Sequence, residues 1–156
     1  MGDVADGVGG GGDGLPDLGD LDLEGLVTDS VLLEVAIPRE ISHCCWPNSR
    51  CHWRSKAEDT QAMRTVARYC AADVLAMAPV TVPPMAALSV QWTIVLGKGQ
   101  RQRDIDNTIA ACKPLMDGIF DVLEADDKRV TQVGVRWERG TESGIKCRIA
   151  SLGTRG

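Results

Sequence analysis

The sequence predicts a fold of the α/β (α+β) class, in which a small mixed β-sheet is covered by two main helices in the order β-α-β-α-β-β. Two observations predict it. Four apolar stretches of strand length are interspersed with two stretches of helical periodicity, and proline- or glycine-rich segments separate several of them. Once a glycine-rich first segment is set aside, about 125 residues remain, which is enough for one domain with a single core.

The first thirty residues differ in composition from the rest. Nine of them are glycine, four in a row, and none is aromatic. Such a segment buries too little apolar surface to offset the entropy of ordering. We therefore expect residues 1–30 to form a disordered, acidic, Gly-rich tail and residues 31–156 to form the folded domain.

The domain is predicted to begin with a strand at Val31 to Ile37, followed by a loop that runs through Trp53. A helix is expected from about Lys56 to Met77, because apolar residues recur there at spacings of three and four. Ser55 and Glu58 have the spacing of a capping box, which favours a helix start at this point.

A proline-rich turn at residues 79–84 separates this helix from a predicted strand at Ala87 to Leu96. The next apolar-periodic stretch predicts a helix from Asn107 to about Leu123. Pro114 and Gly118 lie inside it and are the residues able to bend it.

Two further strands are predicted near Val130 to Glu138 and Ile145 to Ser151. Gly140 to Gly144 lies between them and has turn composition. We therefore expect the last two strands to form a hairpin.

Acidic side chains surround the second predicted helix. Asp104 and Asp106 precede it, and Asp126 and Asp127 follow it. Carboxylate oxygens are hard ligands suited to Mg²⁺, which keeps several waters and takes one or two protein carboxylates plus substrate phosphate oxygens. Separated acids of this kind, with a lysine between them, are what a magnesium-dependent phosphodiester hydrolase requires. Nucleic acid is therefore the first substrate to consider.

The spacing of Asp104 and Asp106 indicates a strand-to-helix junction. Two residues apart, their carboxylates share one face of an extended segment, whereas in a helix they diverge by about 200°. Asn107 can then help to start the helix, since Asn and Asp favour its N-terminal positions. An Asp-rich helix start commonly serves for capping alone, and for this cluster taken by itself capping is the favoured explanation.

Lys113 argues for more than capping. It lies seven residues after Asp106, two helical turns on, and can therefore share a face with that carboxylate. From there its ammonium group could reach a metal-bound phosphate or the attacking water.

The acidic region resembles a known nuclease family. The run Arg-Asp-Ile-Asp-Asn at 103–107, then Lys-x-x-x-Asp-Gly at 113–118, then Asp-Asp-x-x-Val at 126–130 is similar to the central signature of RusA-type Holliday junction resolvases, the crossover junction endodeoxyribonucleases of phages and bacteria. Upstream, residues 47–53 resemble the Pro-Asn-x-Arg-x-His-Trp segment of many members. The similarity covers roughly residues 31–151.

The resemblance implies a homodimer that nicks four-way DNA junctions symmetrically in recombination and repair, leaving ends that a ligase can seal. It implies Mg²⁺ as cofactor, for which Mn²⁺ substitutes. Asp104, Asp106 and Asp127 would be the catalytic, metal-binding carboxylates, and Lys113 the catalytic lysine. The family lysine often lies one turn after the second Asp, where this chain has Ala110, so Lys113 fits only with about one extra turn.

Further residues are candidates for supporting the site or for contacting DNA. Asn107, Asp126 and Asn48 would support the carboxylates. Phosphate contacts are expected from four basic residues, namely Arg50, Lys98, Arg101 and Arg103.

The position of Asp127 raises the question of a shared site. A straight helix from residue 107 to 123 would be on the order of 25 Å long and would hold Asp127 far from Asp104. Either the helix bends, or two antiparallel helices meet across a dimer. A two-fold dimer also matches the approximate two-fold symmetry of a four-way junction.

The charge distribution is compatible with DNA binding. The whole chain has a net charge of -5 and a pI near 5.0, but residues 1–30 hold eight acids and no Lys or Arg. The remaining residues carry 17 basic and 14 acidic side chains, a net charge of +3. The acidic tail is inert, competes for the DNA-binding groove, or binds a partner; we favour the first and rank competition second.

The hydropathy pattern predicts a cytoplasmic protein, and the family resemblance implies a bacterial or phage-infected cell. No membrane span or signal peptide is recognisable. Disulfides are then not expected, and Cys70, Cys112 and Cys147 are interpreted as small core residues. The His and Cys residues at 43–52 lack the spacing of a familiar zinc site.

Two other functions use the same features. A different metal-dependent DNA nuclease, acting on flaps or duplex, would need the same acids. A non-catalytic DNA-binding protein would bind without cleavage. The expected partners of the folded domain are four-way junction DNA and a second copy of the chain, and no membrane association is expected.

Overall fold

The computed structural model of this chain describes residues 29–153. The predicted tail at residues 1–30 therefore lies outside the described residues except for its last two positions, as do residues 154–156 of the predicted domain. The described residues form a four-stranded mixed sheet with three α-helices, which confirms the predicted α+β class. No helix among them is long and apolar enough to span a bilayer.

The sheet has the strand order β1-β4-β2-β3. Each predicted strand is confirmed to within one residue at either end. β4 pairs antiparallel with both β1 and β2, and β2 pairs in parallel with β3. The strands are β1 (Ser30–Ile37), β2 (Ala87–Leu96), β3 (Val130–Arg139) and β4 (Gly144–Leu152).

The predicted hairpin between the last two strands is wrong. β3 and β4 follow one another in the chain, but β2 lies between them in the sheet. The helices before β3 carry the chain across one face of the sheet, so β3 returns parallel to β2 on its outer side. The segment after β3 then crosses the end of β2, where the Gly140 N–H donates a hydrogen bond to the Leu96 carbonyl at 3.0 Å.

The first long helix, α1 (Trp53–Met77), begins three residues earlier than predicted. His52 is its N-cap residue, and its Nδ1 accepts a hydrogen bond from the Arg54 N–H at 3.2 Å. The predicted capping box is therefore wrong, because His52 takes the cap position and places Ser55 and Glu58 inside the first turns.

The second predicted helix consists of two helices. α2 (Ile105–Ala111) and α3 (Lys113–Leu123) meet at Cys112. Pro114 lies in the first turn of α3, where its missing N–H costs little, and it cannot extend the hydrogen-bond ladder of α2. A single straight helix is therefore excluded, and Pro114 lies at the break.

Gly118, the other residue expected to bend the helix, has a different role. It lies inside α3 where this helix crosses α1, and a Cβ at this position would lie 2.1 Å from the carbonyl oxygen of Arg64. Glycine is therefore required for the close approach of the two helices.

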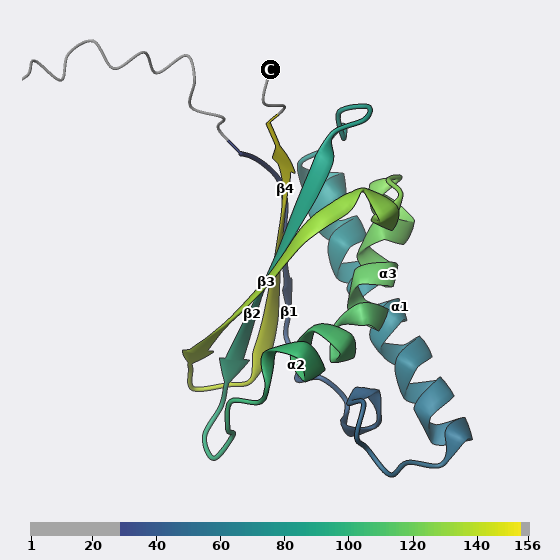
Figure 1. The fold of residues 1–156 in the computed structure, drawn as a ribbon, viewed down its shortest axis with the longest axis vertical. Helices are drawn as coiled ribbons and strands as arrows, with labels where there is room; N and C mark the ends of the chain where they lie inside the picture. The colour runs from purple at the N-terminus through teal and green to yellow at the C-terminus, as the bar shows by residue number, and fades with distance from the viewer. Residues whose placement is uncertain (1–28, 154–156) are drawn as a thin grey trace, which may run out of the picture.

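The core lies between the sheet and the helices, which cover one of its faces (Figure 1). Trp92 of β2, Met63 of α1 and Ile119 of α3 are almost completely buried there. Cys112 and Cys147 are buried among them, which confirms their interpretation as small core residues.

The loop between β1 and α1 is closed by a disulfide between Cys44 and Cys51, so the expectation of no disulfide is wrong for this pair. Cys44 lies in the 3₁₀-helix η3 (His43–Cys45), and a turn follows it in which the Ser49 N–H donates a hydrogen bond to the Trp46 carbonyl at 3.1 Å. The two Cα atoms thereby come within 5.6 Å, inside the range that a disulfide spans.

Candidate nuclease site

Asp104 occupies the N-cap position of α2, at the end of the loop that follows β2. Its backbone carbonyl accepts hydrogen bonds from the Thr108 N–H at 3.0 Å and from the Thr108 hydroxyl at 2.7 Å. Its carboxylate makes no capping hydrogen bond, and the residue is exposed. Capping by this side chain is therefore not observed, and the carboxylate is available to an external ligand.

Asp106 and Asn107 are the second and third residues of α2, so Asn107 does not start the helix as expected. Asp106 is exposed in the first turn, where the positive end of the helix dipole favours a carboxylate. The predicted junction geometry is confirmed for Asp104, whose backbone is extended (φ −62°, ψ 145°). It is wrong for Asp106, which is already helical.

A hollow of about 190 Å³ lies beside Asp104. The loop after η3 and the start of α2 both contribute to its lining. We call it the Asp104 hollow, and it is lined by Trp46, Pro47, Asn48, Arg103, Asp104 and Asn107. Two segments more than fifty positions apart, residues 46–48 and 103–107, therefore meet around one small depression.

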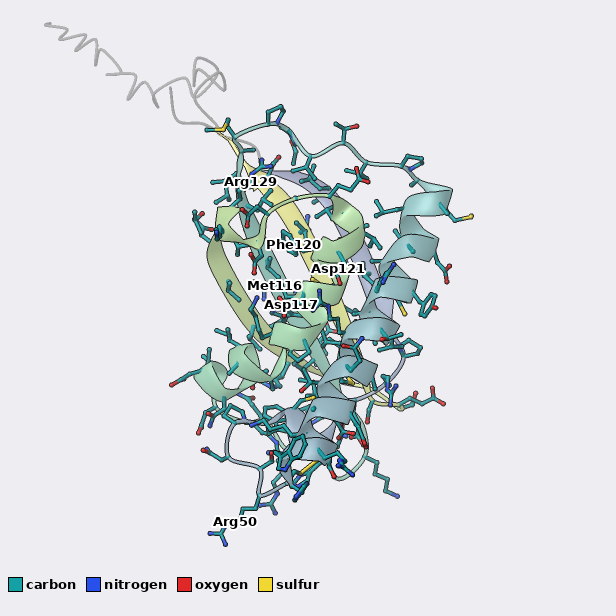
Figure 2. The ribbon with its side chains drawn as sticks, turned by 90° about the vertical axis from the view of Figure 1, so that its right-hand side faces the viewer. Arg50, Met116, Asp117, Phe120, Asp121 and Arg129 are labelled. Carbon is teal, nitrogen blue, oxygen red and sulfur yellow. A yellow bond between two sulfur atoms is a disulfide. The ribbon has the colours of Figure 1, made fainter. Side chains whose placement is uncertain are left out.

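The loop that carries Asn48 is fixed at several points. Besides the disulfide, the Ser49 hydroxyl donates a hydrogen bond to the Cys44 carbonyl at 3.1 Å. The guanidinium carbon of Arg103 lies 4.3 Å from the ring centroid of Trp46, which is a cation–π geometry. Arg50 is exposed and extends away from the body, at the opposite end of the molecule from Arg129 (Figure 2).

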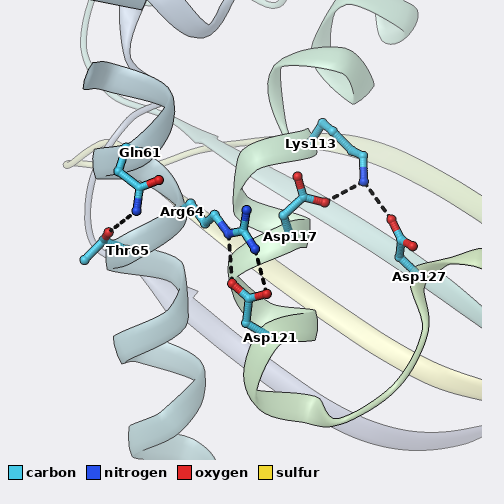
Figure 3. Close-up of polar contacts among 7 residues, drawn as sticks. All are labelled: Gln61, Arg64, Thr65, Lys113, Asp117, Asp121 and Asp127. Atoms are coloured by element: carbon cyan, nitrogen blue, oxygen red, sulfur yellow. Dashed lines mark hydrogen bonds and ion pairs between the residues drawn. The ribbon is translucent and has the colours of Figure 1, made fainter. Parts of the chain in front are cut away.

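Lys113, the first residue of α3, lies between two carboxylates (Figure 3). Its Nζ donates hydrogen bonds to Asp117 Oδ1 at 2.5 Å and to Asp127 Oδ2 at 2.7 Å. Asp127 begins the 3₁₀-helix η4 (Asp127–Arg129), which leads into β3. The chain therefore brings the predicted lysine and the predicted third acid into direct contact within one subunit.

Both partners of this contact are charged at neutral pH. The hydrogen bond from Lys113 lowers the pKa of Asp127 below its ordinary value. Desolvation acts to lower the pKa of Lys113, but the hydrogen bonds to Asp117 and Asp127 outweigh it and raise the pKa. Lys113 is therefore a fixed positive charge.

Neighbouring contacts hold this region in place. Arg64 of α1 donates two hydrogen bonds to Asp121 of α3, each 2.8 Å long (Figure 3). In η4, Asp126 is the N-cap residue and accepts a hydrogen bond from the Lys128 N–H at 2.9 Å. Arg129 Nε donates to the Ala86 carbonyl at 2.9 Å, which ties η4 to the segment before β2.

The acids therefore form two groups, one at each end of α2. Asp104 and Asp106 lie at its start, and Lys113 with Asp127 lies just beyond its end, roughly 10 Å away along the axis at 1.5 Å per residue. Within residues 29–153, no three His, Cys, Asp or Glu side chains are arranged to hold one metal ion. Asp104 and Asp106 supply the hard oxygen donors that Mg²⁺ takes, whereas Asp127 is bound to Lys113.

The predicted DNA-contacting residues near the acids are exposed. Lys98, Arg101 and Arg103 lie in the loop between β2 and α2. In the described part of the chain, none of the three takes part in an ion pair. Their charges are therefore available to an anionic partner.

Sequence reasoning did not single out Trp46. Its ring contacts Arg103 and lines the Asp104 hollow. The sequence does contain a signal for it: Trp46 directly precedes Pro47 and Asn48, in a loop with basic and polar residues, where an aromatic side chain is a candidate for binding.

No protein-family model matches this chain, and no curated protein sequence matches it either.

Proposed function

We propose that this protein is a magnesium-dependent, structure-specific endodeoxyribonuclease of the RusA type, which resolves four-way DNA junctions by paired symmetric nicks. The observation that carries the proposal is the Asp104 hollow. Asn48 from one resembling segment and Arg103, Asp104 and Asn107 from the other line the same depression. If both segments belong to one active site, they are expected to lie together in the fold, as they do around this hollow.

The carboxylates of Asp104 and Asp106 would bind Mg²⁺ or Mn²⁺ together with water and a phosphate oxygen. A metal ion at this position lowers the pKa of bound water and neutralises charge on the phosphate. Both carboxylates are exposed, and within residues 29–153 neither accepts a hydrogen bond. Asp127 as a third metal ligand stays a prediction, since its observed partner is Lys113.

Lys113 would act as an electrostatic group toward the phosphate. Asp117 and Asp127 hold its ammonium at a defined place, and its raised pKa keeps it protonated. A pre-positioned positive charge stabilises the negative charge that develops on phosphate oxygens without reorganisation during the reaction.

Binding of the DNA backbone would fall to the exposed basic residues of the loop between β2 and α2. Lys98, Arg101 and Arg103 immediately precede the acids in the chain. Phosphate contacts by such residues position the duplex without reading its sequence. Junction affinity should therefore fall steeply with salt concentration.

The test is a labelled four-way junction incubated with the protein in the presence and absence of Mg²⁺. We expect nicks at symmetric positions in two opposing strands, only when Mg²⁺ is present, and products that a ligase seals. Linear duplex, three-way and flap DNA of the same sequence are the controls. Equal cleavage of all substrates would indicate a different metal-dependent nuclease, and binding without cleavage would indicate a non-catalytic DNA-binding protein.

A further inference from the structure

A second, larger cavity lies next to the Asp104 hollow. Its volume is about 370 Å³, which is within the range of small-ligand sites of roughly 300–1,000 Å³. It lies at the end of the sheet where β2 finishes and β4 begins, and we call it the sheet-end cavity. Apolar side chains of these strands, including Ile94, Leu96 and Ile145, contribute to its lining.

Two indole side chains also line the sheet-end cavity. Trp46 comes from the loop after η3, and Trp137 comes from β3. Both are only partly buried, although they pack against the core. Partly exposed indoles that line a cavity are candidates for stacking on a planar ring.

The rim of the cavity is polar and fixed. Gln100 Oε1 accepts hydrogen bonds from the Gly97 N–H and the Ser143 hydroxyl, both at 2.8 Å, and its Nε2 donates to the Glu40 carboxylate. Arg101 also lines the cavity. The rim therefore combines pre-positioned polar groups with an exposed cation.

Trp46 and Arg103 line both the sheet-end cavity and the Asp104 hollow. Their cation–π pair therefore lies where the two spaces adjoin. A group bound at Asp104 and a ring bound in the cavity would be neighbours, as the phosphate and base of one nucleotide are.

We infer that the sheet-end cavity binds one nucleobase, unstacked from the DNA at the branch point, while the adjoining phosphate lies at Asp104. This inference rests on the function proposed above. A base at an open branch point has a stacking neighbour on one side only, which lowers the cost of unstacking it. Trp46 and Trp137 provide the stacking surface, and the polar rim meets the edge of the base.

The experiment compares junctions that each lack one base near the branch point. Binding is measured by fluorescence anisotropy without Mg²⁺, so that no strand is cut. Removal of the base at one position should weaken wild-type binding about tenfold, a typical loss for one base–aromatic stack. Trp46→Ala should lose about as much on the intact junction and nothing more on the junction that lacks this base.

Tyr69→Ala serves as the matched control, because Tyr69 is 67% exposed on α1 and does not line the cavity. This variant should keep the full difference between intact and abasic junctions. Equal wild-type affinity for all junctions, or a difference that persists in Trp46→Ala, would overturn the base site.

A second measurement needs no variant. 5-Iododeoxyuridine placed at the sensitive position should photocrosslink the wild-type protein to a peptide that contains Trp46, Trp137 or His43, which all line the cavity. Crosslinks confined to other peptides would overturn the inference. If junctions are nicked but no missing base affects binding, the base site is overturned and the proposed function stands. If junctions are neither bound nor nicked, both are overturned.

Discussion

Lys113 donates a hydrogen bond of 2.7 Å to Asp127, fourteen positions further along the chain. The contact depends on the break at Cys112, which starts α3 at Lys113, and on the turn after α3, which brings η4 back beside the start of that helix. Sequence spacing predicted that Lys113 lies on the same helix face as Asp106. In the structure, Lys113 is instead bound by Asp127, which follows α3.

We expect Lys113→Met to lower the nicking rate by about a hundred- to a thousandfold, as for the loss of one pre-positioned transition-state donor. Junction affinity measured without Mg²⁺ should change little. Lys128→Met is the matched control, since Lys128 is an exposed lysine of the neighbouring η4 and should be dispensable for nicking. Equal nicking by the two variants would exclude an electrostatic role for Lys113.

The ion pair of Lys113 and Asp127 should contribute to stability only between two pH limits. The pKa of Asp127 is lowered from 3.8 by its hydrogen bond with Lys113, so its contribution is present above pH 3.8 and is lost as the pH falls through the folded-state pKa. The pKa of Lys113 is raised from 10.5, so its contribution is complete below pH 10.5 and is lost as the pH rises further.

The measurement is the Tm of the wild type and of Asp127→Asn across the pH range. The wild type should have the higher Tm by a small, constant amount at intermediate pH, because the pair is exposed and screened. The difference should vanish in strong acid. A difference that grows in acid would contradict the lowered pKa of Asp127.

Asp106→Asn should reduce Mg²⁺-dependent nicking to background and leave junction binding intact, because the amide replaces an anionic oxygen donor without changing size. Asp73→Asn, at an exposed position of α1, is the control and should nick normally. A fully active Asp106→Asn protein would remove the basis for placing the chemistry at the start of α2.

Gly118→Ala should destabilise the fold by about 1–3 kcal/mol, because the added methyl group meets the Arg64 carbonyl and forces α1 and α3 apart. The sign of the effect is informative. Where no clash exists, the same substitution inside a helix stabilises by about 1 kcal/mol. Chemical denaturation of both proteins measures the difference, and a stabilised variant would show that the helices do not pack this closely.

The extent of each strand could be predicted from the sequence, whereas the order of the strands could not. Alternating apolar residues such as Leu33, Val35 and Ile37 mark β1 because one face of the sheet is covered. The composition of residues 140–144 suits a hairpin turn as well as it suits the observed connection, which crosses the end of β2. That β2 lies between β3 and β4 depends on the crossover through α2 and α3, which involves the whole domain.

The geometry of the candidate site could be predicted only in part, for a similar reason. Asp104, Asp106 and Lys113 were identifiable by spacing and resemblance, and their exposure agrees with a functional role. The sequence does not locate the helix break at Cys112, because Pro114 is as compatible with a bend inside one helix as with the start of a second helix. The contact between Trp46 and Arg103 is a tertiary one, which no local pattern encodes.

The two groups of acids allow a direct test of a site shared between subunits. Asp106 and Asp127 lie at opposite ends of α2, so a two-fold dimer in which these helices run antiparallel would place Asp127 of one subunit near Asp106 of the other. We therefore expect Asp106→Asn and Asp127→Asn proteins, each inactive alone, to regain activity when unfolded together and refolded as a mixture.

In such a mixture, a heterodimer has one site with both substitutions and one site with none. Random pairing then restores about a quarter of the wild-type sites, and each active dimer nicks only one strand of a junction. Gel analysis of a junction labelled on opposing strands measures both quantities. If each site lies within one chain, every site in the mixture carries a substitution, and the mixture stays inactive.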